Sequence, residues 1–170
     1  MTSNHTIMKL VEDMKIPFAG CYMNYNLPLD VELNKGYIIN LEPLFDEEGN
    51  ENEGTHWCAL IIRETEKGER YGCWFDPLSA PPPQNIDEWV EIPEKELSYS
   101  CKNIQGLKSV LCAYYCVAWL QFCLVSKYRT GHLFHDTDKF LEFFDDMDES
   151  VHFTRNEFVL KNLFFKNEVF

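Results

Sequence analysis

The segment NIQGLKSVLCAYYCVAWLQFCLV, from Asn103 to Val125, is very apolar and sets the architecture expected around it. From about Val110 to Tyr128 its pattern is helical, with apolar residues on nearly every side, which is typical of a buried helix. The segment also holds three cysteines, Cys112, Cys116 and Cys123, which are candidates for core residues, metal ligands, disulfide halves or a nucleophile. The role of these thiols therefore decides the function that the sequence supports.

The same segment raises the alternative of a membrane span. The 18 residues from Ser109 to Ser126 carry no charge, which is the lower limit for a spanning helix. They include Gln121 and two serines, and the apolar part is shorter than the hydrocarbon layer requires. We therefore expect a central helix buried in protein, and no membrane partner.

The composition predicts one globular domain over residues 1–170. Apolar residues make up 45% of the chain and aromatic residues 15%, which is enough for a substantial core. The formal net charge of -13 disfavours a nucleic-acid partner, because such partners are bound by clustered Lys and Arg.

The start of the chain and its cysteine content indicate a reducing compartment. The opening residues MTSNHTIMKLVEDMK lack the apolar stretch and cleavage site of a secretory signal, so we expect a protein that is not secreted. Seven cysteines, an odd number without framework-like spacing, favour reduced thiols over disulfides.

Periodicity predicts an α+β domain in which a small sheet packs against the central helix. Two strand-like runs, His56–Arg63 and Arg70–Asp76, are separated by a charged turn and predict an antiparallel hairpin. A short strand is expected at Tyr37–Leu41. The other expected helices are Ile7–Lys15, ended by Pro17, a short one at Asp87–Val90, one at Asp136–Met147 and one within Phe153–Phe170.

A cysteine nucleophile needs a base, a group that orients the base, and donors for the developing oxyanion. Cys112 falls near the start of the buried helix, where free N–H groups and the helix dipole lower the pKa of a thiol. Cys116 and Cys123 lie deeper in the helix, where a thiol behaves as a small apolar residue. Position therefore favours Cys112.

Three residues are candidates to complete such a site. His56 stands at the mouth of one strand of the expected hairpin and Asp76 ends the other, so both side chains are expected at one sheet end. Gln105, seven residues before Cys112, has a neutral amide that can donate to an oxyanion without adding charge. The remaining histidines fall in the terminus, in loops and at helix ends: His5, His132, His135 and His152.

A metal site is the alternative for some of these residues. Its candidate ligands are Cys101, Cys112, Cys116 and either His132 or His135. The set lacks a Cys-x-x-Cys knuckle, and two of its ligands would lie on an apolar helix. We therefore expect no metal ion and no cofactor.

Three motifs in one order resemble a known family: GTHW at Gly54–Trp57, WFDPLS at Trp74–Ser79 and IQGLKSVLCAYYC at Ile104–Cys116. The chain resembles the adenain family of adenovirus maturation proteases and, more distantly, the SUMO- and ubiquitin-like-specific proteases of the same papain-related group. The segment Leu10–Pro28 is similar to the opening helix and glycine-containing turn of that family. The resemblance covers residues 8–128, in the permuted order His, Asp, Gln, Cys of the adenain-like group.

The resemblance implies a papain-like domain of the adenain type, with a small mixed sheet against a central helix that carries the nucleophile. It implies that Cys112 is the nucleophile, that His56 is its base and later the leaving-group acid, and that Asp76 holds the imidazole. The Gln105 side chain and the Cys112 backbone N–H would form the oxyanion hole. Trp57, next to the base, would shield the pair from water.

The function implied is that of a cysteine endopeptidase that cleaves capsid or other virion precursor polypeptides at glycine-containing sites. Its source would be a DNA virus, a virophage or a related mobile element of the Maverick/Polinton type, and it would act in the virion or in viral factories of the host cytoplasm. Two alternatives remain open. One is a protease acting on host ubiquitin or SUMO conjugates, and the other is a non-catalytic scaffold of the same fold.

Two departures from the family pattern limit what is carried over. Ala113 follows the nucleophile where the family has glycine, and Cys101 does not stand at the distance from Gln105 that the family's peptide activator would need. Neither the peptide activator nor the DNA activator of the family is therefore carried over to this chain. A hydroxyl at an N-cap Ser109 would compete with an oxyanion for the Cys112 N–H, so the helix is expected to open later, at about Val110 to Leu111.

Overall fold

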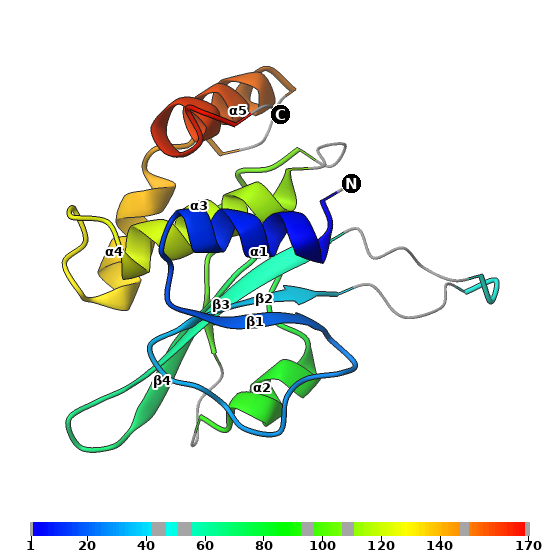
Figure 1. Ribbon diagram of the computed structural model, residues 1–170, viewed down its shortest axis with the longest axis vertical. Helices are drawn as coiled ribbons and strands as arrows, with labels where there is room; N and C mark the ends of the chain where they lie inside the picture. Colours follow the sequence, from blue (N-terminus) through cyan, green and yellow to red (C-terminus); the bar gives the residue numbers. More distant parts are fainter. Residues whose placement is uncertain are drawn as a thin grey trace.

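The computed structural model describes residues 2–41, 47–50, 56–92, 97–106, 111–146 and 150–168, without the side chains of 150–154. Within these residues the fold is α+β, with a mixed five-stranded sheet and five helices (Figure 1). The coarse expectation of a mixed sheet packed against a central helix is therefore confirmed. The motifs GTHW and IQGLKSVLCAYYC lie only partly inside the described residues, because 51–55 and 107–110 fall outside them.

The strands lie in the order β1-β2-β3-β4-β5. The outer pairs β1–β2 and β4–β5 are parallel, and the inner pairs β2–β3 and β3–β4 are antiparallel. The expected hairpin is confirmed as β3–β4, and the expected short strand as β2. The strand bounds are β1 Phe18–Met23, β2 Gly36–Asn40, β3 Trp57–Glu64, β4 Arg70–Phe75 and β5 Ser98–Tyr99.

The helices cover the two faces of the sheet unequally (Figure 1). Helices α1, α3 and α4 pack on one face, and α2 packs on the other. The alternating residues of β3 divide accordingly, since Ala59 and Ile61 face the α3 side while Leu60 and Ile62 face the α2 side. The helix bounds are α1 Asn4–Asp13, α2 Gln84–Val90, α3 Cys112–Leu124, α4 Leu133–Leu141 and α5 Ser150–Phe164.

Helix α3 is the buried central helix that its composition predicts. Ten of its 13 residues are buried. It begins at Cys112 with Leu111 as N-cap and without a side-chain cap, so the expected late opening is confirmed, although Ser109 lies outside the described residues. The helix ends at Leu124, earlier than the expected Tyr128, because the chain turns at Ser126, whose hydroxyl accepts from the Tyr128 N–H at 3.1 Å.

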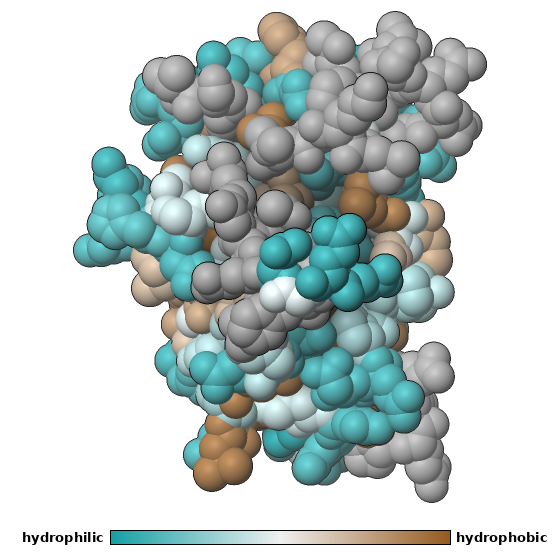
Figure 2. Space-filling view, turned by 90° about the vertical axis from the view of Figure 1, so that its right-hand side faces the viewer, coloured by the Kyte–Doolittle hydropathy of each residue, from teal (hydrophilic) through white to brown (hydrophobic). Residues whose placement is uncertain are grey.

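No helix within the described part of the chain is long and apolar enough to cross a membrane. The 13 residues of α3 extend about 20 Å, against the roughly 30 Å of a hydrocarbon core. Figure 2 shows one face of the molecule, on which hydrophilic residues predominate and hydrophobic ones are scattered between them.

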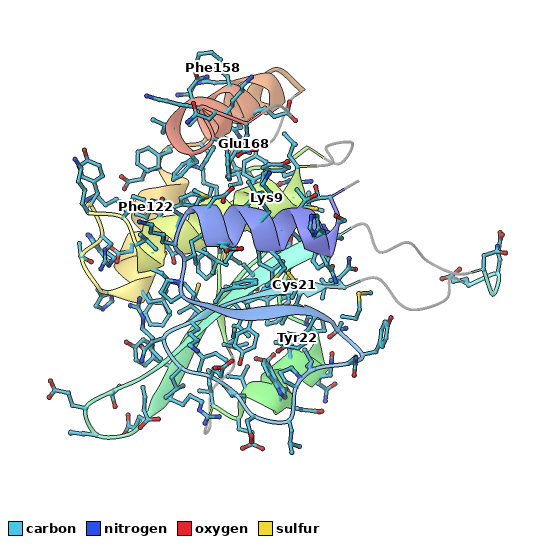
Figure 3. All side chains as sticks on the ribbon, viewed as in Figure 1. Lys9, Cys21, Tyr22, Phe122, Phe158 and Glu168 are labelled. Carbon is cyan, nitrogen blue, oxygen red and sulfur yellow. The ribbon has the colours of Figure 1, made fainter. Side chains whose placement is uncertain are left out.

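An aromatic cluster joins α3 to the helices around it. Phe122 of α3 is labelled in Figure 3. Its ring centroid lies 6.0 Å from that of Phe140 and 5.7 Å from that of Phe143. Phe140 also contacts Phe75 of the sheet and Phe164 of α5, at 5.8 and 5.5 Å. These contacts fix α3 against both the sheet and the C-terminal helices, so they also fix the residue with which α3 begins.

Several expected boundaries differ from the structure. Helix α1 ends at Asp13 rather than at the expected Lys15, because Lys15 adopts a left-handed φ of 56° and its N–H bonds to the Glu12 carbonyl. Strand β1 was not expected, since Gly20 in FAGCYM suggested a turn; a register shift between Phe18 and Gly20 accommodates it within the strand. The two-residue strand β5 was not expected either.

The later helices are also shifted. Helix α4 begins at Leu133 rather than Asp136, because the His132 side chain caps it by accepting from the His135 N–H. Its expected end at Met147 is wrong, since α4 stops at Leu141. The expected helical tail is α5, which begins at Ser150 and ends at Phe164.

Candidate functional site

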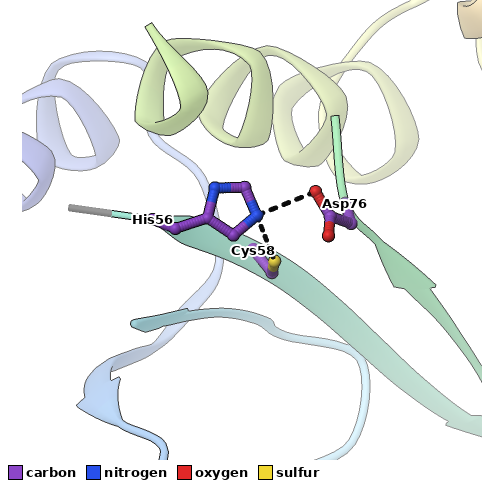
Figure 4. Close-up of side chains that lie close together, drawn as sticks. All are labelled: His56, Cys58 and Asp76. Carbon is purple, nitrogen blue, oxygen red and sulfur yellow. Dashed lines mark hydrogen bonds and ion pairs between the residues drawn. The ribbon is translucent and has the colours of Figure 1, made fainter. Parts of the chain in front are cut away.

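The hairpin brings His56 and Asp76 together at one end of the sheet. His56 directly precedes β3 and Asp76 directly follows β4. Because the two strands are antiparallel, both residues lie at the same end of the hairpin. The His56 Nε2 atom lies 2.9 Å from Asp76 Oδ1 (Figure 4). The Asp76 side chain is 2% exposed and that of His56 is 20% exposed, so this ion pair is sheltered but open on the imidazole side.

The turn after β4 fixes the Asp76 carboxylate. Its Oδ1 atom also accepts a hydrogen bond from the Leu78 N–H at 2.8 Å, and the Ser79 N–H bonds to the Asp76 carbonyl at 2.8 Å. This is the local bonding by which Asp before Pro initiates turns. Asp76 therefore stabilises the turn and binds the imidazole at the same time, since its Oδ1 atom bonds to both the Leu78 N–H and His56.

Cys112 lies beside His56 at the first residue of α3. Its Sγ accepts a hydrogen bond from the Trp57 N–H at 3.4 Å, and its side chain is also hydrogen-bonded to His56. Burial of the ring lowers the pKa of His56, but its hydrogen bonds to Asp76 and Cys112 and its electrostatic interactions with them outweigh burial and raise this pKa to about 10. At neutral pH the ring is an imidazolium between a carboxylate and a sulfur atom.

Cys116 holds the peptide that contacts Cys112. Its thiol donates to the Trp57 carbonyl at 3.3 Å, while the Trp57 N–H donates to Cys112. Burial raises the pKa of Cys116 well above its ordinary value, so the group stays a thiol and keeps its donor proton. The Trp57 indole N–H donates to the Thr2 carbonyl at 3.3 Å, which ties the N-terminal segment to the same residue.

Gln105 is buried, and its loop is attached to the turn that follows Asp76. The N–H groups of Ile104 and Gln105 both donate to the Pro77 carbonyl, at 2.9 and 3.2 Å. The Gln105 N–H also donates to the Asn103 side chain at 3.2 Å. The structure thus brings the Gln105 loop to the Asp76 turn, while residues 107–110, which lead from it to α3, lie outside the described residues.

Asn156 is a site residue that sequence reasoning missed. It lies on α5, is fully buried, and donates to the Ile104 carbonyl at 3.1 Å and the Asp145 carbonyl at 2.8 Å. Its Oδ1 accepts from the Asp145 N–H at 2.8 Å. These bonds hold the residue before Gln105 in place from behind. No motif marked Asn156, since its partners are backbone groups distant in sequence.

Cys58 was missed as well. This buried thiol lies 3.5 Å from His56 Nε2, on the same side of the ring as Asp76 (Figure 4). Burial and the nearby Asp76 raise the pKa of Cys58 well above its ordinary value. The His-x-Cys spacing on a strand was the available signal, because residues two apart share one face of a sheet.

The other cysteines and histidines are not part of this cluster. Cys123 is buried against Thr137, Cys101 is exposed, and all seven cysteines are free. His132 caps α4, and the His152 side chain lies outside the description. The alternative metal ligand set of Cys101, Cys112, Cys116 and His132 or His135 is not assembled, since the one metal-capable group of His, Cys, Asp or Glu found among the described residues is His56, Cys58 and Asp76.

A scan of the chain against protein-family models finds no matching family, and a search of curated proteins finds no match. The adenain resemblance therefore stands on the quoted residues alone. The geometry at His56, Asp76 and Cys112 is a thiol at the start of a buried helix, with an imidazolium beside it and a fixed carboxylate behind the imidazolium. Such an arrangement suits nucleophilic attack by sulfur on an acyl carbon.

Proposed function

We propose that the protein is a cysteine endopeptidase of the adenain-like type. Cys112 is the nucleophile, His56 its base and acid, Asp76 the group that orients the ring, and Gln105 a donor to the oxyanion. The observation that best supports this proposal is the 2.9 Å pair of His56 and Asp76 next to a cysteine that begins a buried helix. Nucleophile, base and orienting group in mutual reach are the signature of covalent catalysis.

The reaction follows from these positions. The Cys112 sulfur, as a thiolate stabilised by the imidazolium, attacks the scissile carbonyl carbon and forms a C–S bond. The His56 proton passes to the leaving nitrogen as the C–N bond breaks, which leaves an acyl-enzyme and a neutral imidazole. A water molecule then gives a proton to His56 and forms a C–O bond with the acyl carbon. The C–S bond breaks, and the thiolate and imidazolium are restored.

The oxyanion of each tetrahedral intermediate needs donors that are fixed in advance. The Cys112 backbone N–H is at the start of α3, where the N–H groups point out of the helix end and the helix dipole favours a negative charge. The amide of Gln105 is the second donor, held by the bonds of its loop to Pro77. Replacing Gln105 by Ala is expected to lower kcat by about 10²- to 10³-fold, as with other single oxyanion donors.

The substrates proposed are polypeptide precursors of a virion, cleaved next to glycine in the virion or in the host cytoplasm. This part rests on the resemblance of the motifs around His56, Asp76 and Cys112. A net charge of -13 suits basic partners such as capsid precursors. No cofactor takes part in the proposed reaction.

A peptide-library digest tests the proposed reaction. The parent, Cys112→Ala and the exposed-site control Cys101→Ser are each incubated with peptides from a denatured proteome, and new termini are identified by mass spectrometry. We expect cleavage next to glycine by the parent and the control, and none by Cys112→Ala. Equal cleavage by all three would contradict the assignment of Cys112.

Vinyl sulfone derivatives of ubiquitin and SUMO distinguish the proposed endopeptidase from a protease that acts on host ubiquitin or SUMO conjugates. Fast Cys112-dependent labelling by either derivative, without cleavage of library peptides, would favour a protease of host conjugates. Absence of both labelling and cleavage, with the parent folded, would favour the non-catalytic scaffold.

A further inference from the structure

Cys58 adds a sulfur donor to the pair of His56 and Asp76. The His56 Nε2 atom lies 3.5 Å from Cys58 Sγ and 2.9 Å from Asp76 Oδ1, and all three ligand atoms lie within 4.8 Å of one another (Figure 4). The proposed reaction uses His56 and Asp76 but gives no role to Cys58. A nitrogen, a thiol sulfur and a carboxylate oxygen are the three donor types that Zn²⁺ binds in proteins.

One of the printed distances matches a tetrahedral metal site, and the other is close to it. Zn–S bonds of about 2.3 Å and Zn–N or Zn–O bonds of about 2.0–2.1 Å separate sulfur and nitrogen ligands by roughly 3.5 Å, and nitrogen and oxygen ligands by roughly 3.4 Å. The Cys58–His56 distance of 3.5 Å already agrees with this geometry. The His56–Asp76 distance of 2.9 Å needs to open by about half an ångström, because a direct hydrogen bond is shorter than the edge of a metal tetrahedron.

The surroundings hold two of the ligands in place. Cys58 is on the buried strand β3, where its backbone pairs with Ile39 of β2, and its side chain is fully buried. Asp76 Oδ1 is oriented by the Leu78 N–H at 2.8 Å, which is the kind of outer bond that supports metal-binding carboxylates. The His56 side chain is 20% exposed, so the group of donors borders solvent at the imidazole.

The charges also balance. Binding of Zn²⁺ releases the proton of the Cys58 thiol and requires an unprotonated Nε2 on a neutral His56. The ion then carries two positive charges against one thiolate and one carboxylate, so the buried group is neutral overall. This charge compensation removes the main free-energy cost of burying an ion beside Cys58, which is 0% exposed.

We propose that His56, Cys58 and Asp76 form a Zn²⁺ site, completed by water, and that its occupation switches the catalytic site off. The ion takes the Nε2 atom that the imidazolium uses to bind Asp76, so His56 is held neutral and no longer donates an Nε2 proton to Asp76. The metal site stands on the geometry of the three donors. The switch rests in addition on the proposed protease function.

Metal binding is tested by titrating the apo protein with Zn²⁺ against a chromogenic chelator, and with Co²⁺ as a spectroscopic probe. All variants carry Cys101→Ser to remove the exposed thiol. The parent and Cys112→Ala are expected to bind one ion, with the charge-transfer absorption of a Co²⁺–thiolate bond. Cys58→Ala is expected to lose that band and at least about tenfold in affinity, and Cys58→Ser serves as a second variant, with circular dichroism confirming that it folds.

The variants distinguish this site from chelation by the catalytic thiol. Loss of the band in Cys112→Ala and its retention in Cys58→Ala would overturn the proposal, since the ion would then sit between Cys112 and His56. Absence of stoichiometric binding to the parent would overturn it as well. These outcomes are measured without substrate, so they are independent of whether the protein cleaves peptides.

The switch is tested by the ratio of cleavage rates with and without Zn²⁺, taken for each variant separately. We expect strong inhibition of the parent that a chelator reverses, and at least about a tenfold higher Zn²⁺ concentration for half-inhibition of Cys58→Ala. Binding of Zn²⁺ without inhibition would overturn the proposed switch, while the proposed metal site would still hold. Equal inhibition of both variants would show that the inhibitory ion is bound without Cys58.

Discussion

Single thiols in this protein differ in chemistry because of where they lie. Cys112 begins a helix beside an imidazolium and accepts from a backbone N–H. Cys116 and Cys123 belong to the same helix, but burial raises the pKa of each, so both remain protonated. The residue type is the same in all three cases, and only Cys112 has a base within reach.

Alkylation rates should follow this difference. In a Cys101→Ser background at neutral pH with a metal chelator present, iodoacetamide is expected to modify Cys112 before Cys116 or Cys123, because the thiolate is the reacting form. Peptide mapping by mass spectrometry at short times measures the order. His56→Ala is the control that should slow Cys112 modification. Earlier modification of Cys116 or Cys123 would mean that the nucleophile is misassigned.

His56 should titrate far above an ordinary histidine. Its pKa of about 10 in the folded protein, against 6.5 for an ordinary histidine, means that it stays protonated across the neutral range. An NMR titration of labelled histidine, with chelator present, is expected to show one midpoint near pH 10 that falls in Asp76→Asn. A midpoint unaffected by Asp76→Asn would contradict the role of that carboxylate.

The same shift predicts how stability depends on pH. Because the folded pKa is raised, the contribution of His56 to stability is complete below about pH 6.5 and is lost as pH rises towards 10. The difference in urea unfolding free energy between the parent and Asp76→Asn should therefore shrink over that window. A difference that grows with pH would have the wrong sign.

Cys116 is expected to act as a positioning residue through its bond to the Trp57 carbonyl. Cys116→Ala removes the donor and should lower kcat about fivefold with little change in KM, since one hydrogen bond contributes about 1 kcal/mol. Cys116→Ser keeps a donor and should restore most of the rate. Cys123→Ala, a buried thiol two turns on, is the matched control, which should lower stability and leave kcat unchanged. Equal kcat for the Ala and Ser variants at Cys116 would contradict the donor role.

At the scale of elements, the site depends on α5 as well as on the hairpin. Asn156 bonds to Ile104, next to Gln105, and to both backbone groups of Asp145. Helix α5 is thus connected to the loop that carries the proposed oxyanion donor. The partners of the Asn156 side chain are all backbone atoms, which is why neither the spacing nor the composition of α5 indicated the connection.

The variant Asn156→Ala should show an effect on the Gln105 loop in addition to a general loss of stability. Loss of a buried amide that satisfies three backbone groups is expected to lower the free energy of unfolding by about 1–3 kcal/mol, and to lower kcat more than KM. Hydrogen exchange should rise in residues 97–106. Asn162→Ala, on the exposed side of α5, is the control, and a similar exchange increase there would argue against a specific role for Asn156.

How well each element was predicted depends on the kind of evidence its sequence carried. The hairpin β3–β4 and helix α3 were predicted because their apolar runs are long and bounded by turn residues. Strand β1 has no fully buried residue and contains Gly20, so it shows neither alternation nor a continuous apolar run. Its strand character comes from pairing with β2, which the local sequence does not specify.

At the scale of the whole molecule, the site is assembled from segments that only the fold joins. The pairing of β3 with β4 brings His56 to Asp76, and the packing of α3 on the sheet brings Cys112 to both. The aromatic cluster around Phe122 and Phe140 fixes α3. Phe140 is central to that cluster and fully buried. The position of the nucleophile therefore depends on core packing far from it.

Replacing a core phenylalanine by alanine should lower the free energy of unfolding much more than replacing a surface phenylalanine. Phe140→Ala is expected to lower the free energy of urea unfolding by about 3–5 kcal/mol, because it leaves a cavity among four rings. Phe158→Ala on α5, which is 68% exposed (Figure 3), should change stability by no more than about 0.5 kcal/mol. Similar losses for both would mean that the cluster does not carry the helix packing.

The sequence by itself determined the central buried helix, the hairpin, the α+β class and the candidates His56, Asp76, Gln105 and Cys112, because periodicity and motif order are local properties of the chain. Only the tertiary structure decided that His56 and Asp76 meet at 2.9 Å, that Cys116 and Asn156 support the site, and that Cys58 completes a set of metal donors. The physical reason is that these contacts join residues on different elements. Their distances are fixed by strand register and helix packing, which no short stretch of sequence encodes.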